Sequence, residues 1–249
     1  MMGKLSGKTA LITGASKGIG EGIARVYARE GANLVLCARG SQTEQLCEAL
    51  REEYGIEAIF VQTDVSDMQA CVHAADEAAA HFGQIDILVS NAGVCRLGGF
   101  LEASEEDRDY HLDVNVKGAW NICHAVLPYM KERQYGRVII MSSVTGYMVA
   151  DPGEAGYAMS KAALIGLTKA LAKEEGPSGI TVNCVAPGVV ETDMMAGFTA
   201  EDKAALAEET PVGRLAAPEE IAQTLVFLAG ENAGYITGQV IGQNGGLVI

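Results

Sequence analysis

Short apolar runs rich in β-branched residues alternate along the chain with longer stretches whose apolar positions recur at helical spacing. Most of the short runs are apolar at every position, which indicates strands buried on both faces of a parallel sheet. The expected strands are Thr9–Thr13, Asn33–Ala38, Ala58–Thr63, Ile85–Ser90, Arg137–Met141, Thr181–Val185 and Gln239–Gly242. The alternation predicts the α/β class, with a doubly wound parallel sheet and helices on both faces.

No repeat, low-complexity tract or linker divides the chain, so a single domain spanning 1–249 is expected. The longest polar interruption runs from Ala196 to Pro211. Long polar segments between regular elements are often functional, and the region near 190–211 is predicted to be a substrate lid. Ser66–Gln69 and Ser104–Asp107 resemble the capping boxes that begin helices.

Acidic residues outnumber basic ones: 32 Asp and Glu against 18 Lys and Arg give a net charge of −14. Nucleic acids and anionic membranes attract clustered cations, so both are disfavoured as partners. The first apolar run, Ala10–Ile12, is too short for a signal-peptide core or a membrane span. These features favour a cytoplasmic protein.

Cysteine and histidine are sparse and scattered. Six cysteines lie at least ten residues apart, and the chain has four histidines, so neither a disulfide framework nor a zinc pattern emerges. No metal site is predicted. The cysteines are expected to be reduced and mostly buried, because a chain of this length can stand on its own core.

Glycines cluster in Thr13–Gly22, where the first strand gives way to a helical pattern. Bare backbone can approach a pyrophosphate closely there, while the helix N-terminus presents N–H groups to the negative charge. The segment does not end in Gly-Lys-Ser/Thr as a Walker loop does. It predicts dinucleotide binding by a Rossmann fold, the simpler alternative being a tight turn that serves only helix packing.

The end of the second strand bears on the choice of cofactor. An acidic residue there would bind the ribose 2′-hydroxyl of NAD, but this chain has Ala38 followed by Arg39, and Lys17 lies in the glycine loop. Two cations would suit a 2′-phosphate. NADP(H) is therefore predicted in preference to NAD(H), unless both cations are only solvated surface charges.

A tyrosine and a lysine lie one helical turn apart, at Tyr157 and Lys161, and Ser143 precedes them by fourteen residues. Side chains at i and i+4 share a helix face, so the ammonium can lie near the phenol. At about 4 Å and an effective dielectric near 20, the attraction is worth roughly 4 kcal/mol, or about three pKa units. Tyr157 is thus expected to exchange a proton near neutral pH.

These motifs together resemble the short-chain dehydrogenase/reductase family in its form of about 250 residues, over essentially the whole chain. Its T-G-x-x-x-G-x-G loop is similar to Thr13–Gly20, and its N-A-G motif to Asn91–Gly93. Its catalytic Asn, Ser, Tyr and Lys correspond to Asn115, Ser143, Tyr157 and Lys161. Its P-G segment corresponds to Pro187–Thr192, and its adenine-contacting D-V pair to Asp64 and Val65.

The resemblance implies roles for these residues in hydride transfer between NADP(H) and a ketone or aldehyde and its alcohol. Tyr157 would be the proton donor or acceptor, and Ser143 would hold the substrate oxygen. Lys161 would bind the nicotinamide ribose, and Asn115 would hold a water in a proton relay. The implied cofactor site is Gly14, Ser16, Lys17, Gly18, Ile19, Gly20, Arg39, Asp64, Val65, Asn91, Ala92, Gly93, Tyr157, Lys161, Pro187, Gly188, Val190 and Thr192.

The substrate itself is less well specified than the reaction. Apolar residues suited to a bulky ketone such as a hydroxysteroid, or simply to packing, are Tyr147, Met148, Val149, Met194, Met195 and Phe198. Arg96 would either anchor a carboxylate or face solvent.

Two other functions remain open. A 3-oxoacyl-(acyl-carrier-protein) reductase needs a basic patch on which the acidic carrier protein docks, and Arg133 and Arg137 could contribute to one. The net charge of −14 opposes the approach of such an acidic partner. A catalytically silent NADP-binding sensor would typically lack Tyr157 or Lys161, and both are present.

Assembly is suggested by two apolar surfaces. The helical stretch Ser104–Arg133 is apolar around more than one face, and the chain ends in Leu247–Ile249. In similar proteins the corresponding helices and C-terminal strand form interfaces, so a homotetramer of dihedral symmetry is expected. A tail that folds back on its own subunit is the alternative.

Overall fold

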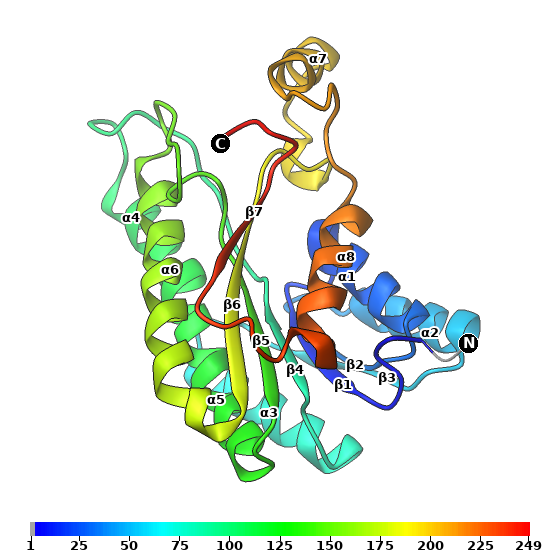
Figure 1. Ribbon diagram of the computed structural model, residues 1–249. Coiled ribbons are helices and arrows are strands. Elements are labelled where there is room, and N and C mark those ends of the chain that lie inside the picture. Colours follow the sequence, from blue (N-terminus) through cyan, green and yellow to red (C-terminus); the bar gives the residue numbers. More distant parts are fainter. Residues whose placement is uncertain (1–2) are drawn as a thin grey trace.

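The computed structural model describes residues 3–249 and confirms the expected class (Figure 1). Seven strands form one sheet in the order β3-β2-β1-β4-β5-β6-β7, and every neighbouring pair is parallel. The strands are β1 Thr9–Thr13, β2 Asn33–Ala38, β3 Ala58–Gln62, β4 Ile87–Ser90, β5 Gly136–Met141, β6 Ile180–Pro187 and β7 Val240–Gln243.

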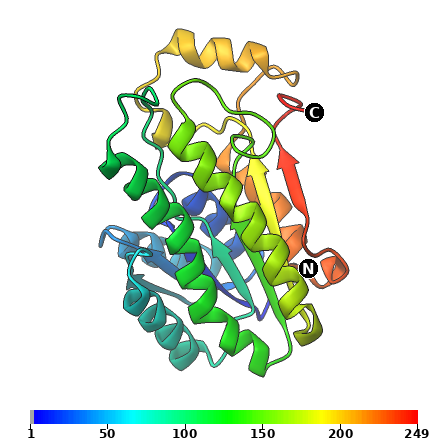
Figure 2. The same ribbon diagram turned by 90° about the vertical axis from the view of Figure 1, so that its left-hand side faces the viewer.

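Helices cover the sheet on both sides (Figure 2). One face carries α1 Gly18–Arg29, α2 Thr43–Tyr54 and α8 Pro218–Ala229. The other carries α3 Met68–Phe82, α5 Gly118–Glu132 and α6 Ala155–Glu175. Shorter elements are α4 Glu105–His111, the π-helical η1 Leu112–Lys117, η2 Gly176–Ser178, η3 Asp193–Met195, α7 Ala200–Glu209 and η4 Glu231–Ala233.

Alternating strand residues supply two separate cores. In β1, Ala10 and Ile12 belong to the core beneath α1 and α8, whereas Leu11 belongs to the core beneath α3 and α5. All three are fully buried, and burying a large aliphatic side chain is worth roughly 1.5–3 kcal/mol. This two-sided burial explains why the strands are apolar at consecutive positions.

Strand order reverses between β1 and β4, which lie side by side although two βα units separate them in the sequence. Connections leave the two strands toward opposite faces of the sheet, and ligands of doubly wound folds bind at the carboxyl ends of the strands at such a point. Those ends carry the glycine loop, residues 91–103, residues 142–154 and residues 188–217.

Helix starts were predicted with mixed success. Ser104 and Asp107 form the capping box, in which each side chain binds the other residue's backbone N–H. The box at Ser66 is wrong: Asp67 caps α3 by accepting a hydrogen bond of 2.8 Å from the Gln69 N–H. Ser66 instead donates its N–H and hydroxyl to the preceding Asp64 carboxylate.

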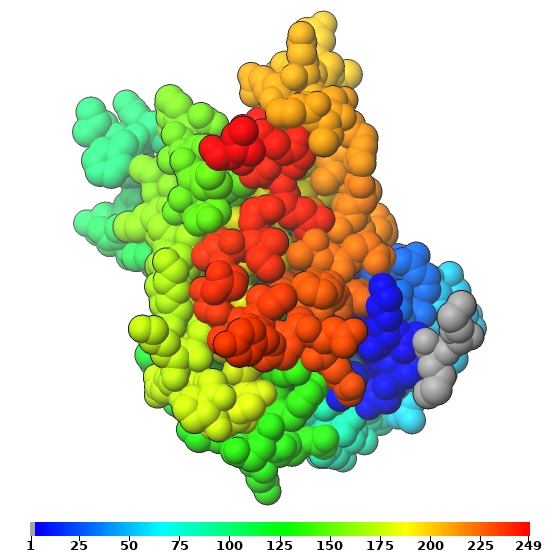
Figure 3. Space-filling model, in the orientation of Figure 1, coloured from blue at the N-terminus to red at the C-terminus, as the bar shows by residue number. Residues whose placement is uncertain are grey.

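Two segments protrude beyond the carboxyl ends of the strands, the one around residue 100 and the one that carries α7 (Figure 3). The second falls within the region 190–211 that the sequence marks as a lid. After β7, the C-terminal tail contacts the residue that directly follows this region, since the Val212 N–H donates to the Gly245 carbonyl at 3.2 Å. The tail thus folds partly onto its own subunit, while Ile249 is fully exposed.

The described residues carry six free cysteines, of which five are buried as predicted and Cys95 is half-buried. Between residues 3 and 249, no helix has both the length and the apolar character needed to cross a membrane. Over the same residues, no group of three or more His, Cys, Asp and Glu is arranged to hold a metal ion.

Candidate active site

The glycine loop brings bare backbone to the carboxyl end of β1. Gly14 and Gly18 have φ angles of 65° and 58°, in the left-handed region that favours glycine. A Cβ at Gly20 would lie 2.1 Å from the Gly14 carbonyl oxygen, so this contact requires glycine. Ser16 lies in the turn, and Ile19 packs on the core. The first N–H groups of α1 have no partner within the helix and are available at this end of the loop. The loop fits the pyrophosphate of a dinucleotide.

The segment Asn91–Gly93 is bound to the glycine loop. Thr13 Oγ1 accepts hydrogen bonds from the N–H groups of Asn91 (3.0 Å) and Ala92 (3.1 Å). The Asn91 amide donates in turn to the carbonyls of Thr13 and Gly14, at 3.0 and 3.2 Å. The ends of β1 and β4 are therefore locked together on either side of the switch point.

Lys161 lies at the centre of the site and is buried. Its Nζ donates to the Met141 carbonyl at 2.9 Å, and Ser142 Oγ donates to the Lys161 carbonyl at 2.8 Å. A Cβ at Gly93 would lie 3.2 Å from Nζ, so the missing side chain leaves room for the ammonium. Burial disfavours the charged form and lowers the pKa of Lys161 to about 8.

Asn115 is buried in η1, where the helix widens between α4 and α5. Its side chain binds both backbone groups of Val94, accepting from the N–H at 2.8 Å and donating to the carbonyl at 2.9 Å. It also donates to Ser160 Oγ at 2.8 Å, and Ser160 donates to the Tyr157 carbonyl at 2.7 Å. Asn115 thus joins the segment after β4 to the first turn of α6.

Tyr157 and Ser143 come together at the carboxyl end of β5. Burial raises the pKa of Tyr157 to about 12, a side-chain hydrogen bond with Ser143 opposes that rise, and the nearby Cys95 and Glu154 add to it. Because the phenol is protonated throughout the neutral range, it can donate a proton.

Lys161 does not lie where the i, i+4 argument placed it. Its Nζ is 5.6 Å from the centroid of the Tyr157 ring and points to the Met141 carbonyl. Burial of the phenol is the largest cause acting on its pKa and raises it, so the expectation that Tyr157 has a pKa near neutrality is wrong for this structure. The helix spacing gave the shared face correctly but carried no information about burial.

Arg39 and Asp64 lie near one another beyond the ends of β2 and β3. Burial opposes ionisation of Asp64, but bonds from the Ser66 hydroxyl and N–H, with the charges of Arg39 and Lys117, lower its pKa. Arg39 is exposed beside the buried Ala38. A cation and no acidic side chain therefore follow β2 directly.

Two other predicted cofactor residues are held differently. Val65 is buried, and its carbonyl accepts from the Asn121 amide at 2.9 Å, so it fixes the loop after β3. Lys17 is exposed, and its Nζ lies 3.9 Å from an Asp193 carboxylate oxygen in η3. This contact links the glycine loop to the predicted lid.

The segment after β6 crosses in front of the glycine loop. Pro187 pairs with β7, and a Cβ at Gly188 would lie 2.9 Å from the Asn244 Cα, so only glycine passes there. Val190 forms a bridge with Ala216, and the side chain of Thr192 lies beside Gly18. The predicted sites Pro187–Thr192 and Gly14–Gly20 therefore converge.

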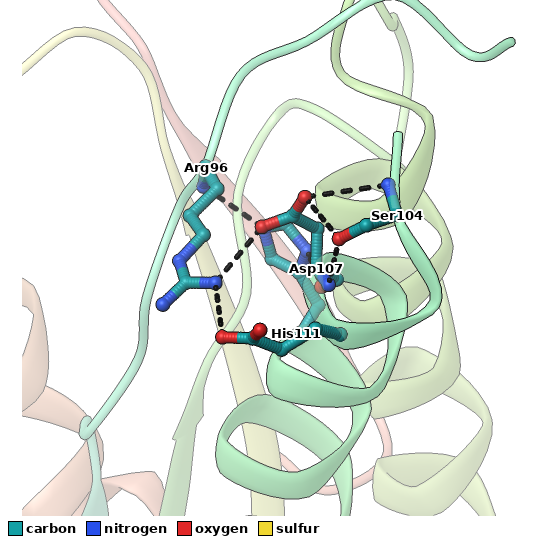
Figure 4. Close-up of polar contacts among 5 residues, drawn as sticks. Arg96, Ser104, Asp107 and His111 are labelled. Atoms are coloured by element: carbon teal, nitrogen blue, oxygen red, sulfur yellow. Dashed lines mark hydrogen bonds and ion pairs between the residues drawn. The ribbon is translucent and has the colours of Figure 1, made fainter. Parts of the chain in front are cut away.

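The Arg96 side chain contacts residues of α4 in its own subunit. Its Nη1 lies 2.8 Å from Asp107 and 3.5 Å from Glu106 (Figure 4). Its guanidinium carbon also lies 4.1 Å from the centroid of the Tyr110 ring. These partners all come from α4 or its first turn. Arg96 is exposed, which agrees with the solvent-facing interpretation, and its charge is paired with carboxylates of its own subunit.

Sequence reasoning assigned no individual role to two polar residues that border the site, although one of them, Glu154, lies in the stretch Thr145–Ala155 expected on the substrate side. Glu154, one turn before Tyr157, accepts hydrogen bonds from the Thr145 hydroxyl (3.2 Å) and the Asp151 N–H (3.0 Å). His111, four residues before Asn115, is buried between α4 and α6. Their spacing of three and four residues from predicted catalytic positions was the available signal.

Comparison with known proteins agrees with this arrangement. The family model described as "Enoyl-(Acyl carrier protein) reductase" matches residues 14–248. "Oxidoreductase UcpA" from Salmonella typhimurium is 51% identical over 245 residues, covering 95% of this chain and 93% of the relative. The 3-oxoacyl-(acyl-carrier-protein) reductase FabG of Thermotoga maritima is 39% identical over 248 residues, covering 99% and 100%.

Solved structures are similarly close. A short-chain dehydrogenase/reductase from Serratia marcescens matches with a TM-score of 0.92 at 39% identity, covering 98% of this chain and 99% of that one. A short-chain type dehydrogenase/reductase from Mycobacterium marinum matches with a TM-score of 0.93 at 33% identity, covering 98% and 97%. With its sheet order, its glycine loop and these relatives, the chain belongs to the short-chain dehydrogenase/reductase family of oxidoreductases, which use a nicotinamide cofactor, NAD or NADP, on small-molecule substrates.

Proposed function

We propose that the protein is an NADP(H)-dependent oxidoreductase that interconverts a ketone or aldehyde and the corresponding alcohol. The observation that carries the proposal is the meeting of Tyr157, Ser143 and Lys161 at the carboxyl end of β5, beside the glycine loop. A bound nicotinamide supplies or accepts the hydride at this place. The chain's own residues bind the substrate oxygen and move its proton.

In the direction of reduction, the Tyr157 hydroxyl donates its proton to the substrate oxygen as that oxygen gains negative charge. A pKa of about 12 keeps this proton in place until it is needed. Ser143 orients the substrate oxygen toward the phenol. In the direction of oxidation, Tyr157 first releases its own proton to water, on the side where Lys161 and Asn115 lie. The phenolate then accepts the proton of the alcohol.

The residues around the glycine loop support a preference for NADP(H). Arg39 is exposed beside Ala38, and Lys17 needs only to give up a contact of 3.9 Å with Asp193 to reach a 2′-phosphate. Exposed ion pairs of this kind are worth only about 0–1 kcal/mol, so the exchange is energetically easy. Charge-assisted hydrogen bonds to phosphate are stronger.

Exposed apolar side chains near the site suit a hydrophobic substrate such as a hydroxysteroid. They come from the segment after β4, from the segment before α6 and from the lid at 190–211: Leu97, Phe100, Leu101, Tyr147, Met148, Met194 and Phe198. Met195 is buried and belongs to packing instead. We propose that the lid covers the substrate through these side chains.

A 3-oxoacyl-(acyl-carrier-protein) reductase is the second candidate, and the FabG relatives favour it. Within the subunit, the proposed docking cations argue against it. Arg137 is buried at the second residue of β5, where it donates to the Gly136 carbonyl at 2.9 Å, and Arg133 lies 3.8 Å from buried Asp86. Both lie at the opposite end of β5 from Ser143. A silent sensor remains the third candidate.

A substrate panel separates these functions. Purified protein is mixed with NADPH or NADH and with small ketones, ketosteroids or an acyl-carrier-protein substrate, and cofactor absorbance is followed. The proposal expects the highest kcat/KM with a hydrophobic ketone and NADPH. Fastest turnover of the carrier-protein substrate would establish the second candidate, and cofactor binding without any turnover the third.

We further propose a cytoplasmic homotetramer with a single catalytic domain, 1–249, in each subunit. Trp120 on α5 and Phe227 on α8 expose large apolar surfaces on opposite faces of the sheet. Sedimentation at micromolar concentration tests this proposal, and a species of 26.1 kDa would contradict it.

A further inference from the structure

The two ring nitrogens of His111 bind backbone groups of two different segments. Nε2 accepts a hydrogen bond of 2.9 Å from the Arg96 N–H, and Nδ1 lies 2.8 Å from the Asp107 carbonyl oxygen (Figure 4). Because the N–H can only donate and the carbonyl can only accept, the ring is neutral and carries its proton on Nδ1. The imidazole is thus fixed in one tautomer and ties α4 to the segment after β4.

Residues 94–101, which follow β4, form the substrate loop. Asn115 binds both backbone groups of Val94 at its beginning, and the Arg96 side chain reaches Asp107 from the solvent side. An exposed ion pair is worth about 0–1 kcal/mol. The part-buried bond from the Arg96 N–H instead ends on the buried His111 ring, where loss of the bond leaves a polar atom without a partner. His111 is therefore the main anchor of the loop at Arg96.

His111 also lies against the first turn of α6, behind the proposed proton donor. The His111 and Tyr157 rings have centroids 6.4 Å apart. Gly156 makes this approach possible, since a Cβ there would lie 3.0 Å from His111 Nδ1. One imidazole thus sets the position of the substrate loop relative to the helix that carries Tyr157.

The loop that His111 holds faces the reaction centre. Its Cys95 thiol lies close enough to Tyr157 and Lys161 to affect the pKa of both. Beyond Arg96, the Gly98 N–H donates to the Gly153 carbonyl at 3.0 Å, which joins the loop to the segment before α6. A shift at Arg96 would therefore move two walls of the substrate site together.

We propose that His111 is a positioning residue of the reaction, which holds the substrate loop through the Arg96 N–H and thereby supports substrate binding. The inference rests on the proposed oxidoreductase function. It predicts that loss of the Nε2 acceptor acts on KM for the carbonyl substrate, and leaves cofactor binding and the proton donor intact.

Two neutral amides test this contact as a matched pair. In His111→Gln the side-chain oxygen reaches about as far as Nε2 and can still accept from the Arg96 N–H. In His111→Asn the amide reaches only as far as Nδ1, so that acceptor is lost. We expect His111→Asn to raise KM by about tenfold with kcat changed less than about threefold, and His111→Gln to stay within about twofold of wild type.

Exposed His124 on α5 offers the control, since His124→Asn makes the same chemical change outside the site. Cofactor dissociation constants, measured by fluorescence titration, should be equal in all four proteins. Equal KM values for His111→Asn and His111→Gln would overturn the proposal. So would a loss of cofactor affinity that accounts for the fall in activity.

Hydrogen exchange provides a readout that needs no turnover. Residues 94–101 should exchange faster in His111→Asn than in His111→Gln or His124→Asn, while α1 and β1 stay unchanged. Unchanged exchange in the loop refutes the inference even if the enzyme is active. Faster exchange in a protein that reduces none of the substrates refutes the proposed function and leaves the contact established.

Should His111→Asn not fold, the same bond can be removed from its other partner. Arg96→Pro deletes the N–H, and Arg96→Ala removes the same side chain but keeps the N–H. We expect faster exchange at residues 97–101 in Arg96→Pro than in Arg96→Ala. Equal exchange in the two variants would overturn the proposal.

Discussion

Around the glycine loop, main-chain geometry makes the site, whereas around the substrate loop, individual side chains hold it. Gly14, Gly18 and Gly20 are needed because backbone passes backbone, and a Cβ at Gly20 would lie 2.1 Å from a carbonyl oxygen. The substrate loop instead depends on His111 and Asn115 reaching across from neighbouring helical turns. Any chain that keeps the fold and its glycines keeps the first region, but the second can change with a single residue.

Because of this difference, membership of the family indicates the type of reaction but does not identify the substrate. Hydride chemistry belongs to the cofactor, which main-chain geometry would hold, whereas the choice of substrate depends on individual side chains of the loops. Four substitutions distinguish the glycine loop from the substrate loop, and their expected effects on activity decrease from Tyr157 to Glu154.

Tyr157→Phe acts where the two regions meet and should have the largest effect. Only the transferable proton is removed and the ring still packs, so we expect kcat to fall by about 10²–10⁴-fold with cofactor affinity nearly unchanged. Steady-state kinetics and a cofactor titration measure both quantities. Retention of more than about a tenth of wild-type kcat would show that another group donates the proton.

Lys161→Met should damage cofactor binding and turnover together while relieving a buried charge. Burial lowers the pKa of Lys161 from 10.5 to about 8, so below pH 8 folding must bury a charged group that the unfolded chain keeps in water. Between about pH 8 and 10.5 the folded state loses this proton first, and that penalty fades as the pH rises.

The test is a comparison of unfolding free energies by denaturant titration at pH 7 and pH 9.5. Relative to Lys161→Met, wild type should gain stability on going from pH 7 to pH 9.5. A difference that stays constant or moves the other way would contradict the burial argument.

Arg39→Ala should affect the cofactor region alone. Loss of one charge-assisted contact to a 2′-phosphate is expected to raise KM for NADPH by about tenfold or more, with KM for NADH and for the ketone unchanged. Arg29, on the far end of α1, provides the matched control as Arg29→Ala. Equal losses with NADPH and NADH would mean that Arg39 does not read the phosphate.

Glu154→Gln should affect the substrate region alone and by the least. The Glu154 carboxylate adds to the elevated pKa of Tyr157 as the last of its causes, so removing this charge lowers that pKa. In the direction of alcohol oxidation, the pH profile of kcat/KM should move to lower pH, with cofactor affinity unchanged. A shift to higher pH would show that the carboxylate does not act on Tyr157 through its charge.

Local pattern was enough to predict the strands, the glycine loop and the residues that converge at the end of β5, because each depends on periodicity or on short spacing. It failed where the answer depends on burial. Burial raises the pKa of Tyr157, and the helical spacing of Tyr157 and Lys161 says nothing about burial. The partner of Arg96, Asp107 on α4, likewise follows only from the three-dimensional arrangement. His111 went unnoticed because its spacing of four residues from Asn115 is a weak signal until its two hydrogen-bond partners are in place.

The π-helical turn η1 also constrains how this protein can tolerate insertions and deletions. A π-helical turn holds one residue more than an α-helical turn, so the face that α4 presents is offset by about 100° from that of an uninterrupted helix continuing into α5. Deleting one residue within 112–117 would leave a longer and more regular helix. It would also rotate His111 and Asp107 away from the substrate loop. A more regular helix at this turn would therefore cost the loop its hydrogen bonds to α4.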